Sequence, residues 1–225
     1  MIAVSAQPYA DRDEAGRMLA PHLEDYAGRD DVVVLGLPRG GVPVAARVAE
    51  ALRAPLDVLL VRKLGTPGQP ELAMGAVARV AGRLAVVRHQ AVLDLGIGDE
   101  EFDRVLERET PELERREAIY RDDRPSPDVT GRVVIVVDDG LATGSTVRAA
   151  LAALRSGEPA RRVVAVPLGS AEACRTVAAE ADEVVCPWVP EQFGGVGQGY
   201  QDFSPTTDEE VRGLLDRSRS SREGA

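Results

Sequence analysis

The chain is poor in the side chains from which metal centres, disulfide scaffolds and catalytic triads are built. Its 225 residues include only two cysteines, Cys174 and Cys186, and only two histidines. Two cysteines are too few for a disulfide framework, so we expect buried thiols in a reducing compartment. The same scarcity leaves no spacing suited to zinc, and two scattered histidines are poor material for a catalytic triad.

Long apolar runs are missing as well. The longest fall far short of the roughly 20 residues that a membrane-spanning helix requires, and no hydrophobic leader follows Met1. The formal net charge of −10 argues against nucleic acid as the main partner, because phosphate contacts need a basic surface. We therefore expect a cytoplasmic protein with no membrane partner and no nucleic-acid partner.

Three common active-site loops are also missing from the sequence. No glycine-rich loop ends in Gly-Lys-Ser or Gly-Lys-Thr, which argues against a P-loop nucleotidase. The glycines at 140 and 144 do not form the dinucleotide-binding fingerprint. Gly144-Ser145 lacks the flanking glycine of a nucleophile elbow, which argues against a serine hydrolase of that type.

The most informative stretch of the chain runs from Val133 to Thr146. Five β-branched apolar residues, typical of a strand buried on both faces, lead into Asp138 and Asp139. Residues 143–146, Thr-Gly-Ser-Thr, then precede a helical segment, whose free backbone N–H groups and dipole favour a phosphate. Two carboxylates beside a phosphate-binding loop are suited to binding a sugar phosphate, because its hydroxyls can donate hydrogen bonds to them. The alternative is an ordinary turn with two solvated acids, a costly way to end an apolar strand.

This stretch resembles the signature of the type I phosphoribosyltransferases, which bind 5-phosphoribosyl-1-pyrophosphate (PRPP). The resemblance implies that Asp138 and Asp139 are catalytic and take the ribose hydroxyls, directly or through Mg²⁺. The residues that would cradle the 5-phosphate are Ala142, Thr143, Gly144, Ser145 and Thr146. The implied reaction is displacement of pyrophosphate from the ribose by a nitrogenous base or another small nucleophile.

Two other strand ends carry cations. Residues 36–41, Gly-Leu-Pro-Arg-Gly-Gly, follow an apolar strand and permit close backbone approach. The resemblance assigns Arg39 and Gly40 to the pyrophosphate, which family members often hold through a strained peptide; a tight turn with a surface arginine is the alternative. Lys63, the only lysine among 27 basic residues, ends the predicted third strand before a Gly- and Pro-containing loop at 64–70. Related transferases place a basic residue there on the pyrophosphate, although chance composition is the alternative.

Aromatic residues are scarce, but four of the eight lie between residues 188 and 203. This segment is typical of an irregular hood in which a planar base stacks on an aromatic face, with Trp188 and Phe193 as candidates. Residues 199–203, Gly-Tyr-Gln-Asp-Phe, resemble the segment that places an Asp on a second Mg²⁺ in hypoxanthine-guanine transferases, which implies a metal role for Asp202. The alternative is a C-terminal arm that packs its aromatic residues into the core.

One residue departs from the hypoxanthine-guanine pattern. Those transferases carry an Asp where this chain has Ala142, and Leu141-Ala142-Thr143-Gly144 instead resembles the adenine and uracil enzymes. The departure argues against a 6-oxopurine acceptor without establishing another. Three functions stay open: a Mg²⁺-dependent transferase, a PRPP-sensing module without turnover, and a different sugar-phosphate enzyme such as a hydrolase. The family resemblance also implies a homodimer.

Alternation of strands and helices predicts an α/β fold, a parallel-sheet phosphoribosyltransferase core with helices on both faces. We expect a single domain over 1–225, with a core at about 30–187, a hood from about 1–27 and 188–217, and a frayed tail at 218–225. The predicted strands are 32–37, 56–62, 133–137, 162–166 and 183–186, with an antiparallel hairpin joining 72–80 to 83–87.

Helical patterns cover the remaining long segments. The predicted helices lie within 7–27, 42–53, 99–121, 147–151 and 171–180. Pro111 is expected to break the charged segment 99–121 into two helices. The stretch between Arg88 and Gly131 is the candidate for the lid that family members close over the reaction.

Overall fold

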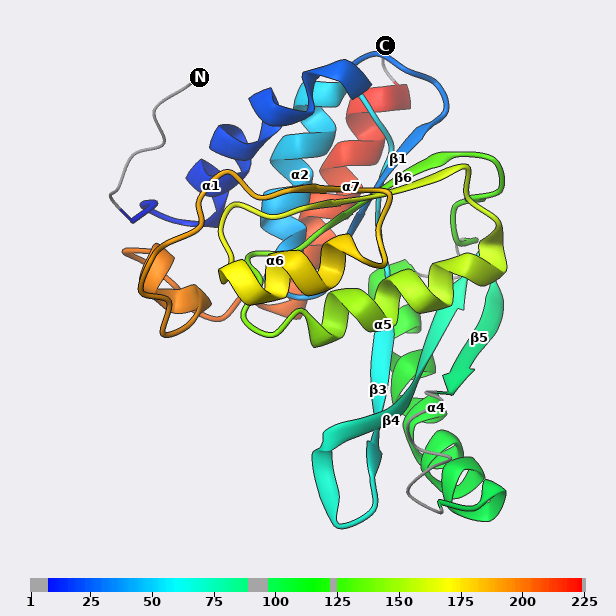
Figure 1. The fold of residues 1–225 in the computed structure, drawn as a ribbon. Helices are drawn as coiled ribbons and strands as arrows, with labels where there is room; N and C mark the ends of the chain where they lie inside the picture. Colours follow the sequence, from blue (N-terminus) through cyan, green and yellow to red (C-terminus); the bar gives the residue numbers. More distant parts are fainter. Residues whose placement is uncertain (1–7, 89–96, 122–124, 224–225) are drawn as a thin grey trace.

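The computed structural model describes residues 8–88, 97–121 and 125–223. These residues form two β-sheets. The main sheet is parallel, with the strand order β2-β1-β6-β7-β8. Its strands are β1 (Val32–Gly36), β2 (Leu56–Val58), β6 (Val133–Val137), β7 (Arg161–Ala165) and β8 (Glu183–Val185). The second sheet is antiparallel and extends away from the main body as an arm (Figure 1). It contains β3 (Val61–Thr66), β4 (Gln69–Val80) and β5 (Arg83–Arg88). The predicted α/β fold class is confirmed.

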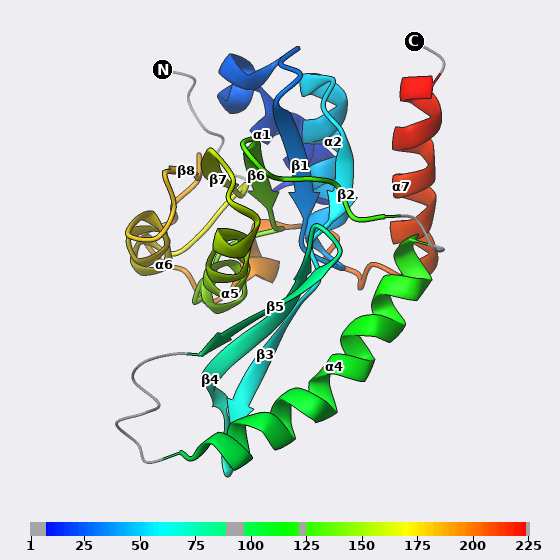
Figure 2. The same ribbon diagram turned by 90° about the vertical axis from the view of Figure 1, so that its right-hand side faces the viewer.

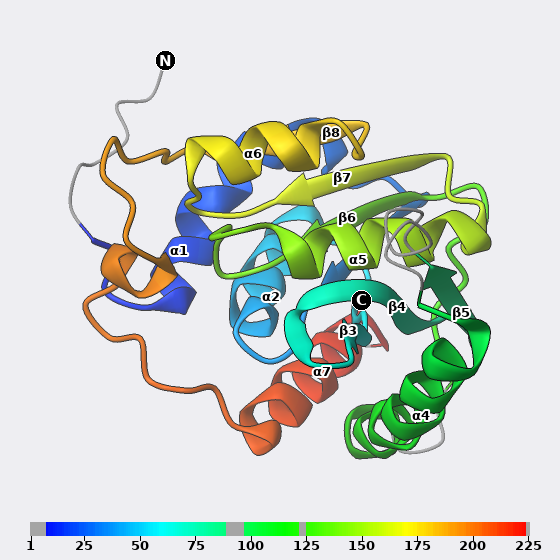
Figure 3. The same ribbon diagram turned by 60° about the horizontal axis from the view of Figure 1, so that its bottom comes forward.

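Helices cover both faces of the parallel sheet, as predicted. On one face lie α1 (Arg12–Leu19), α2 (Gly41–Leu52) and α7 (Asp208–Glu223), while α5 (Ser145–Leu154) and α6 (Ala171–Ala178) lie on the other (Figure 3). Alternate residues of each strand enter opposite layers of the core. Val32 and Val34 pack with α2 and α7, whereas Val33 and Leu35 pack with α5 and α6. This two-sided burial explains why the strands read as unbroken apolar runs.

The predicted strand 56–62 is wrong, because the chain changes sheets within it. β2 ends at Val58 after pairing with β1, and β3 begins at Val61 to pair with β4. An apolar run gives no local signal for such a switch, since both halves suit a buried strand. β3 then continues to Thr66, so the segment 64–70 forms the end of a hairpin rather than a loop. The predicted hairpin 72–80/83–87 is confirmed, with its turn at Ala81 and Gly82, both at positive φ.

Pro111 does not break the charged helix, contrary to our expectation. α4 (Asp99–Arg121) runs continuously through it and lies along the arm, against β3 and β4 (Figure 2). Pro111 lacks the N–H that would donate to the Glu107 carbonyl one turn earlier, yet the helix continues to Arg121. Leu113 and Tyr120 are buried on either end of this second half, so tertiary packing outweighs the local preference.

The described parts of the two terminal segments are helical. The segment 7–27 contains α1 and a 3₁₀ helix, Ala20–Tyr26, rather than one helix. Within the expected frayed tail 218–225, α7 continues as far as Glu223, so fraying of this segment stays a prediction. Val211 and Leu215 bury one face of α7 in the core, which holds the helix in place. The helices of the described segments include none with both the length and the apolar composition to cross a membrane.

Candidate functional site

The acid pair lies where two neighbouring strands of the parallel sheet end. β1 and β6 pair in register up to Gly36 and Val137, so the loop 37–41 lies beside Asp138 and Asp139. A Cβ atom on Gly41 would lie 2.6 Å from the Val137 carbonyl oxygen, and one on Gly40 would lie 2.0 Å from Asp139 Oδ2. Only glycine permits this approach, so the small residues of the 36–41 segment fit directly against the acid pair.

Both carboxylates are held in surroundings that oppose their charge. Burial raises the pKa of Asp138 well above its usual value, and the neighbouring charge of Asp139 raises it further. Burial also raises the pKa of Asp139, while its hydrogen bond with Arg12 acts in the opposite direction. Two shielded acids side by side are unfavourable unless a cation or a hydrogen-bonding ligand approaches them. Shielded acids of this kind are common at functional sites, and a binding role for Asp138 and Asp139 stays a prediction.

Arg12 is the site residue that the sequence analysis missed. Its Nε lies 2.9 Å from Asp139 Oδ2, and its guanidinium lies 4.0 Å from the centroid of the Phe203 ring. Its Nη1 donates to the Ser204 carbonyl oxygen at 2.8 Å. Locally, Arg12 is only the first residue of α1, so nothing in its sequence neighbourhood points to an acid pair far along the chain. The structure thus couples the N-terminal helix and the C-terminal segment to the acids.

Tyr200 provides a second link between the C-terminal segment and the acid pair. Its hydroxyl donates to the Asp139 carbonyl oxygen at 2.6 Å, and burial together with the Asp139 charge raises the pKa of Tyr200. Tyr9 and Tyr200 also form a parallel bridge, in which the Tyr9 N–H donates to the Gly199 carbonyl oxygen at 2.8 Å. Segments from both chain ends therefore meet beside the site, as the predicted hood requires.

The predicted phosphate loop leads into α5 at the carboxyl end of β6. Gly144 has φ of 72°, and its missing Cβ lets α6 pack closely, since a Cβ would lie 2.8 Å from Val177. The Thr143 hydroxyl donates to Ser145 Oγ at 3.1 Å, and the Ser145 N–H donates to Thr143 Oγ1 at 3.3 Å. Ala142, Thr143 and Thr146 are exposed. The first N–H groups of a helix lack intrahelical partners, so an anion could bind this loop.

The two predicted pyrophosphate cations occupy different surroundings. Lys63 lies within β3 rather than at a strand end, and its Nζ donates to Ser145 Oγ at 3.3 Å. Arg39 is exposed in the glycine loop, and the Pro38–Arg39 peptide bond is cis. Its guanidinium lies 3.9 Å from Asp208, the first residue of α7. Lys63 therefore touches the phosphate loop, whereas Arg39 belongs to the loop beside the acid pair.

The candidate base-contacting residues lie in an aromatic cluster. Trp188 and Phe193 pack against Tyr9 and Tyr200, together with Leu168 and Val196. The Trp188 ring meets the Tyr9 ring edge-on, with centroids 5.6 Å apart. Trp188 and Phe193 are only partly buried. Packing within the hood thus accounts for the partial burial of both rings, while contact with a base stays a prediction.

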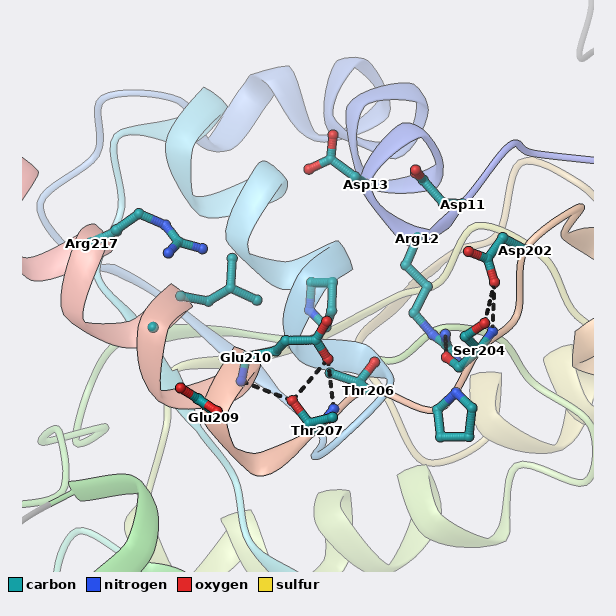
Figure 4. Close-up of a pocket in the computed structure, with 14 residues that line it drawn as sticks. Asp11, Arg12, Asp13, Asp202, Ser204, Thr206, Thr207, Glu209, Glu210 and Arg217 are labelled. Atoms are coloured by element: carbon teal, nitrogen blue, oxygen red, sulfur yellow. Dashed lines mark hydrogen bonds between the residues drawn. The ribbon is translucent and has the colours of Figure 1, made fainter.

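Asp202 is set apart from the acid pair. Its carboxylate accepts hydrogen bonds from the Ser204 N–H at 2.9 Å and the Ser204 hydroxyl at 2.6 Å, which lower the pKa of Asp202. It lines a cavity of about 690 Å³ between α1 and α7, with Glu209 and Arg217 further along the wall (Figure 4). Both hydrogen bonds end on Asp202 Oδ1, and the metal role of Asp202 stays a prediction.

The acid pair fits a partial rather than a complete set of magnesium ligands. Within residues 8–88, 97–121 and 125–223, no three His, Cys, Asp or Glu side chains gather as a metal site. Mg²⁺ commonly uses only one or two carboxylates and completes its octahedron with waters and substrate phosphates. Asp138 and Asp139 could supply that minimal share, and the predicted Mg²⁺ would then depend on a bound phosphate ligand.

Comparisons with known proteins show which family the chain resembles. The sequence model of the phosphoribosyl transferase domain matches residues 9–201. A Mycobacterium tuberculosis H37Rv protein that is named a phosphoribosyl transferase is 46% identical over 210 residues, or 93% of this chain and 47% of that protein. The crystal structure of TT1426 from Thermus thermophilus matches with a TM-score of 0.82 and 44% identity, over 93% of this chain and 98% of that one.

A more distant relative belongs to the same comparison. The bifunctional protein PyrR of Roseiflexus sp. RS-1 is 30% identical over 183 residues, which cover 77% of this chain and 80% of that protein. This chain spans about half the length of the Mycobacterium tuberculosis relative. The similarity thus concerns one half of that protein.

Proposed function

This chain belongs to the phosphoribosyltransferase family, and from that premise we propose that it transfers the 5-phosphoribosyl group of PRPP to a nitrogenous base or another small nucleophile, releasing pyrophosphate. The observation that supports this most is the placement of the shielded acids Asp138 and Asp139 directly before an exposed phosphate loop. One ligand with a phosphate, vicinal hydroxyls and a pyrophosphate would satisfy these groups together.

The proposed division of labour follows from the charge that develops on the sugar. Departure of pyrophosphate gives the ribose ring an oxocarbenium character, which negative charge beside the ring stabilises. Asp138 and Asp139 provide that charge, and residues 142–146 hold the 5-phosphate so that the ring is fixed in place. Arg39 and Lys63 supply positive charge for the anionic leaving group. No side chain has to act as a nucleophile.

Mg²⁺ is the proposed cofactor, with Asp138, Asp139 and Asp202 as its candidate protein ligands. When bound, the metal would neutralise charge on the pyrophosphate. Arg12 already offsets part of the acid pair's charge through its 2.9 Å contact with Asp139. The remaining carboxylate oxygens would then serve ribose hydroxyls or the metal. A homodimer and a cytoplasmic location remain predictions of the family resemblance and of composition.

The acceptor is the least defined part of the proposal. Ala142 replaces the Asp that hypoxanthine-guanine transferases carry, which argues against a 6-oxopurine. Adenine and uracil are therefore the first bases to test. The hood around Trp188 and Phe193 is the proposed place for the base, because flat aromatic faces favour stacking.

A pyrophosphate-release assay tests the proposal. Protein, Mg²⁺ and PRPP are incubated with adenine, uracil, guanine or hypoxanthine, or with no base, and the Asp139→Asn variant is run in parallel. Release that needs one base supports transfer. Release without any base would indicate a hydrolase, and PRPP binding without release would indicate a sensing module. Calorimetry showing no heat with PRPP at millimolar Mg²⁺ would refute the PRPP site itself.

A further inference from the structure

The two cysteines of the chain meet in space next to the phosphate loop. Cys174 lies on α6 and Cys186 directly follows β8, yet both sulfurs border the same point beside Gly169. A Cβ atom on that glycine would lie 3.1 Å from Cys174 Sγ and 3.4 Å from Cys186 Sγ. Both residues are free thiols of intermediate exposure. The absent side chain at Gly169 leaves the room in which the two sulfurs approach each other.

The surroundings shift the pKa values of the two thiols in opposite directions. The Cys186 thiol donates to the Trp188 carbonyl oxygen at 3.5 Å, and the Cys174 sulfur is a second acceptor within its reach. The interaction of Cys174 with the Cys186 thiol, with help from the positive charge of Arg175, lowers the pKa of Cys174. The same contact and burial raise the pKa of Cys186. A more exposed, more acidic thiol beside a more buried one is typical of an attacking and a resolving cysteine.

We propose that Cys174 and Cys186 form a modification site, at which a peroxide closes a reversible intrachain disulfide. The Cys174 thiolate attacks one oxygen of hydrogen peroxide, the O–O bond breaks, and a Cys174 sulfenic acid and hydroxide form. The Cys186 sulfur then attacks the sulfenic sulfur, so that the S–S bond forms and the S–O bond breaks. The Cys186 proton leaves with the departing hydroxide as water, and a dithiol reductant reverses the process.

The position of the pair connects this chemistry to the phosphate loop. One turn before Cys174, the Ser170 hydroxyl donates to the Ala142 carbonyl oxygen at 3.0 Å, and the Ser170 N–H donates to the Leu141 carbonyl oxygen at 2.9 Å. Further along α6, Val177 packs against Gly144. Figures 1 and 2 show α6 beside α5, which follows the loop. A covalent bond from α6 to the end of β8 therefore acts on the helix that supports residues 141–144.

The disulfide is expected to weaken phosphate binding. Closing it draws α6 toward the strand end, while Ser170 and Val177 carry that displacement to the loop. This consequence rests on the proposed function, whereas formation of the disulfide does not. Couplings between two sites of a protein commonly change affinity by about fivefold or more, so we expect a loss of this size in ribose 5-phosphate affinity.

The chemical step is tested by counting thiols and mapping peptides without reductant after treatment with hydrogen peroxide. Wild-type protein should lose both thiols per chain and yield one cross-linked peptide pair containing Cys174 and Cys186. Cys186→Ser should stop at a sulfenic acid that dimedone traps at Cys174, and Cys174→Ser should form neither product. Retention of two thiols, or disulfides only between chains, would overturn the proposal.

The effect on the loop is tested by calorimetry with ribose 5-phosphate on reduced, oxidised and re-reduced protein. Affinity should fall about fivefold or more on oxidation and return with dithiothreitol, while peroxide-treated Cys174→Ser should bind like reduced wild type. Equal affinity of disulfide-bonded and reduced protein would overturn the coupling to the loop. If reduced protein bound neither ribose 5-phosphate nor PRPP, the proposed function would fail, and the peptide map would still decide the disulfide.

Discussion

The carboxyl edge of the parallel sheet and the three-stranded arm use charge in opposite ways. At the edge, two acids of like sign lie side by side and shielded, and burial raises the pKa of both. In the arm, charges of opposite sign pair across the elements, as Arg62 does with Glu109 and Arg79 with Glu117. Like charges that the fold holds together indicate a ligand, whereas paired charges on a partly exposed surface indicate structure alone.

The two regions also differ in the kind of packing that holds them together. The edge depends on close backbone approach at Gly40 and Gly41, which leaves the acids in place beside an exposed loop. The arm depends on apolar burial between α4 and its sheet, including Leu64 and Leu113. Damage to the arm should therefore appear as lost stability, and damage to the edge as lost chemistry.

The largest expected effect on stability comes from the arm. Leu113→Ala removes a fully buried side chain on α4 and should lower the free energy of unfolding by about 2–5 kcal/mol. Leu84→Ala, on the same arm but 41% exposed, is the control and should change stability by less than about 0.5 kcal/mol. Urea denaturation measures both. The comparison breaks if folded Leu113→Ala protein binds ribose 5-phosphate much more weakly than wild type.

Asp139→Asn should show the reverse pattern at the edge. Loss of one preorganised charge beside the developing sugar cation costs about 3 kcal/mol of activation free energy, or roughly 10²-fold in turnover. Ribose 5-phosphate binding should change little, because the phosphate loop is untouched. Asp31→Asn, an exposed acid just before the opposite end of β1, is the matched control. Wild-type turnover of Asp139→Asn with any identified acceptor would make the acid pair structural.

The edge could be predicted from the sequence because its parts are contiguous. Residues 133–146 contain strand, acids, loop and helix start in one stretch, and residues 36–41 repeat the strand-to-helix pattern. The parallel register then brings the two stretches together without further information. Local chemistry and tertiary structure agree here, so the strands, the glycine turn and the place of the acid pair all followed from short motifs.

The hairpin of the arm and the existence of a hood were predicted, but the way in which both join the rest of the molecule was not, because distant contacts decide it. Leu56 to Arg62 is one apolar run, and only its pairing with β1 and then with β4 divides it between two sheets. Pro111 would end an isolated helix, yet packing against the arm keeps α4 intact. Arg12 and Asp139 are 127 positions apart in the sequence, and neither local sequence indicates that the two residues are in contact.

Arg12→Ala tests how far the edge depends on the hood. A hydrogen bond to a charged group is worth about 1.5–3 kcal/mol, so losing the contact with Asp139 should lower turnover by roughly ten- to a hundredfold. Arg17→Ala is the control, since Arg17 lies on the same helix, is exposed and forms an ion pair with Asp13 rather than with the acid pair. Steady-state kinetics of pyrophosphate release compares the two. Equal activities would place Arg12 outside the working site and confine its role to the packing of Phe203.

The smallest of these effects is expected at Lys63. This residue lies on β3 of the arm, but its side chain contacts Ser145 at the carboxyl edge of the parallel sheet. Its ammonium is exposed and lies 3.3 Å from Ser145 Oγ, so we expect Lys63→Ala to cost about 1.5 kcal/mol of PRPP binding, or roughly tenfold. If Lys63 serves the pyrophosphate, ribose 5-phosphate should bind almost as before, since it lacks that group. Lys63→Arg should recover only part of the loss, because the guanidinium donates in a fixed fork.

If calorimetry showed that PRPP and ribose 5-phosphate lose affinity equally, Lys63 would instead be assigned to the 5-phosphate, as its contact with Ser145 allows. If neither ligand bound more weakly to Lys63→Ala than to wild type, Lys63 would have no role in ligand binding.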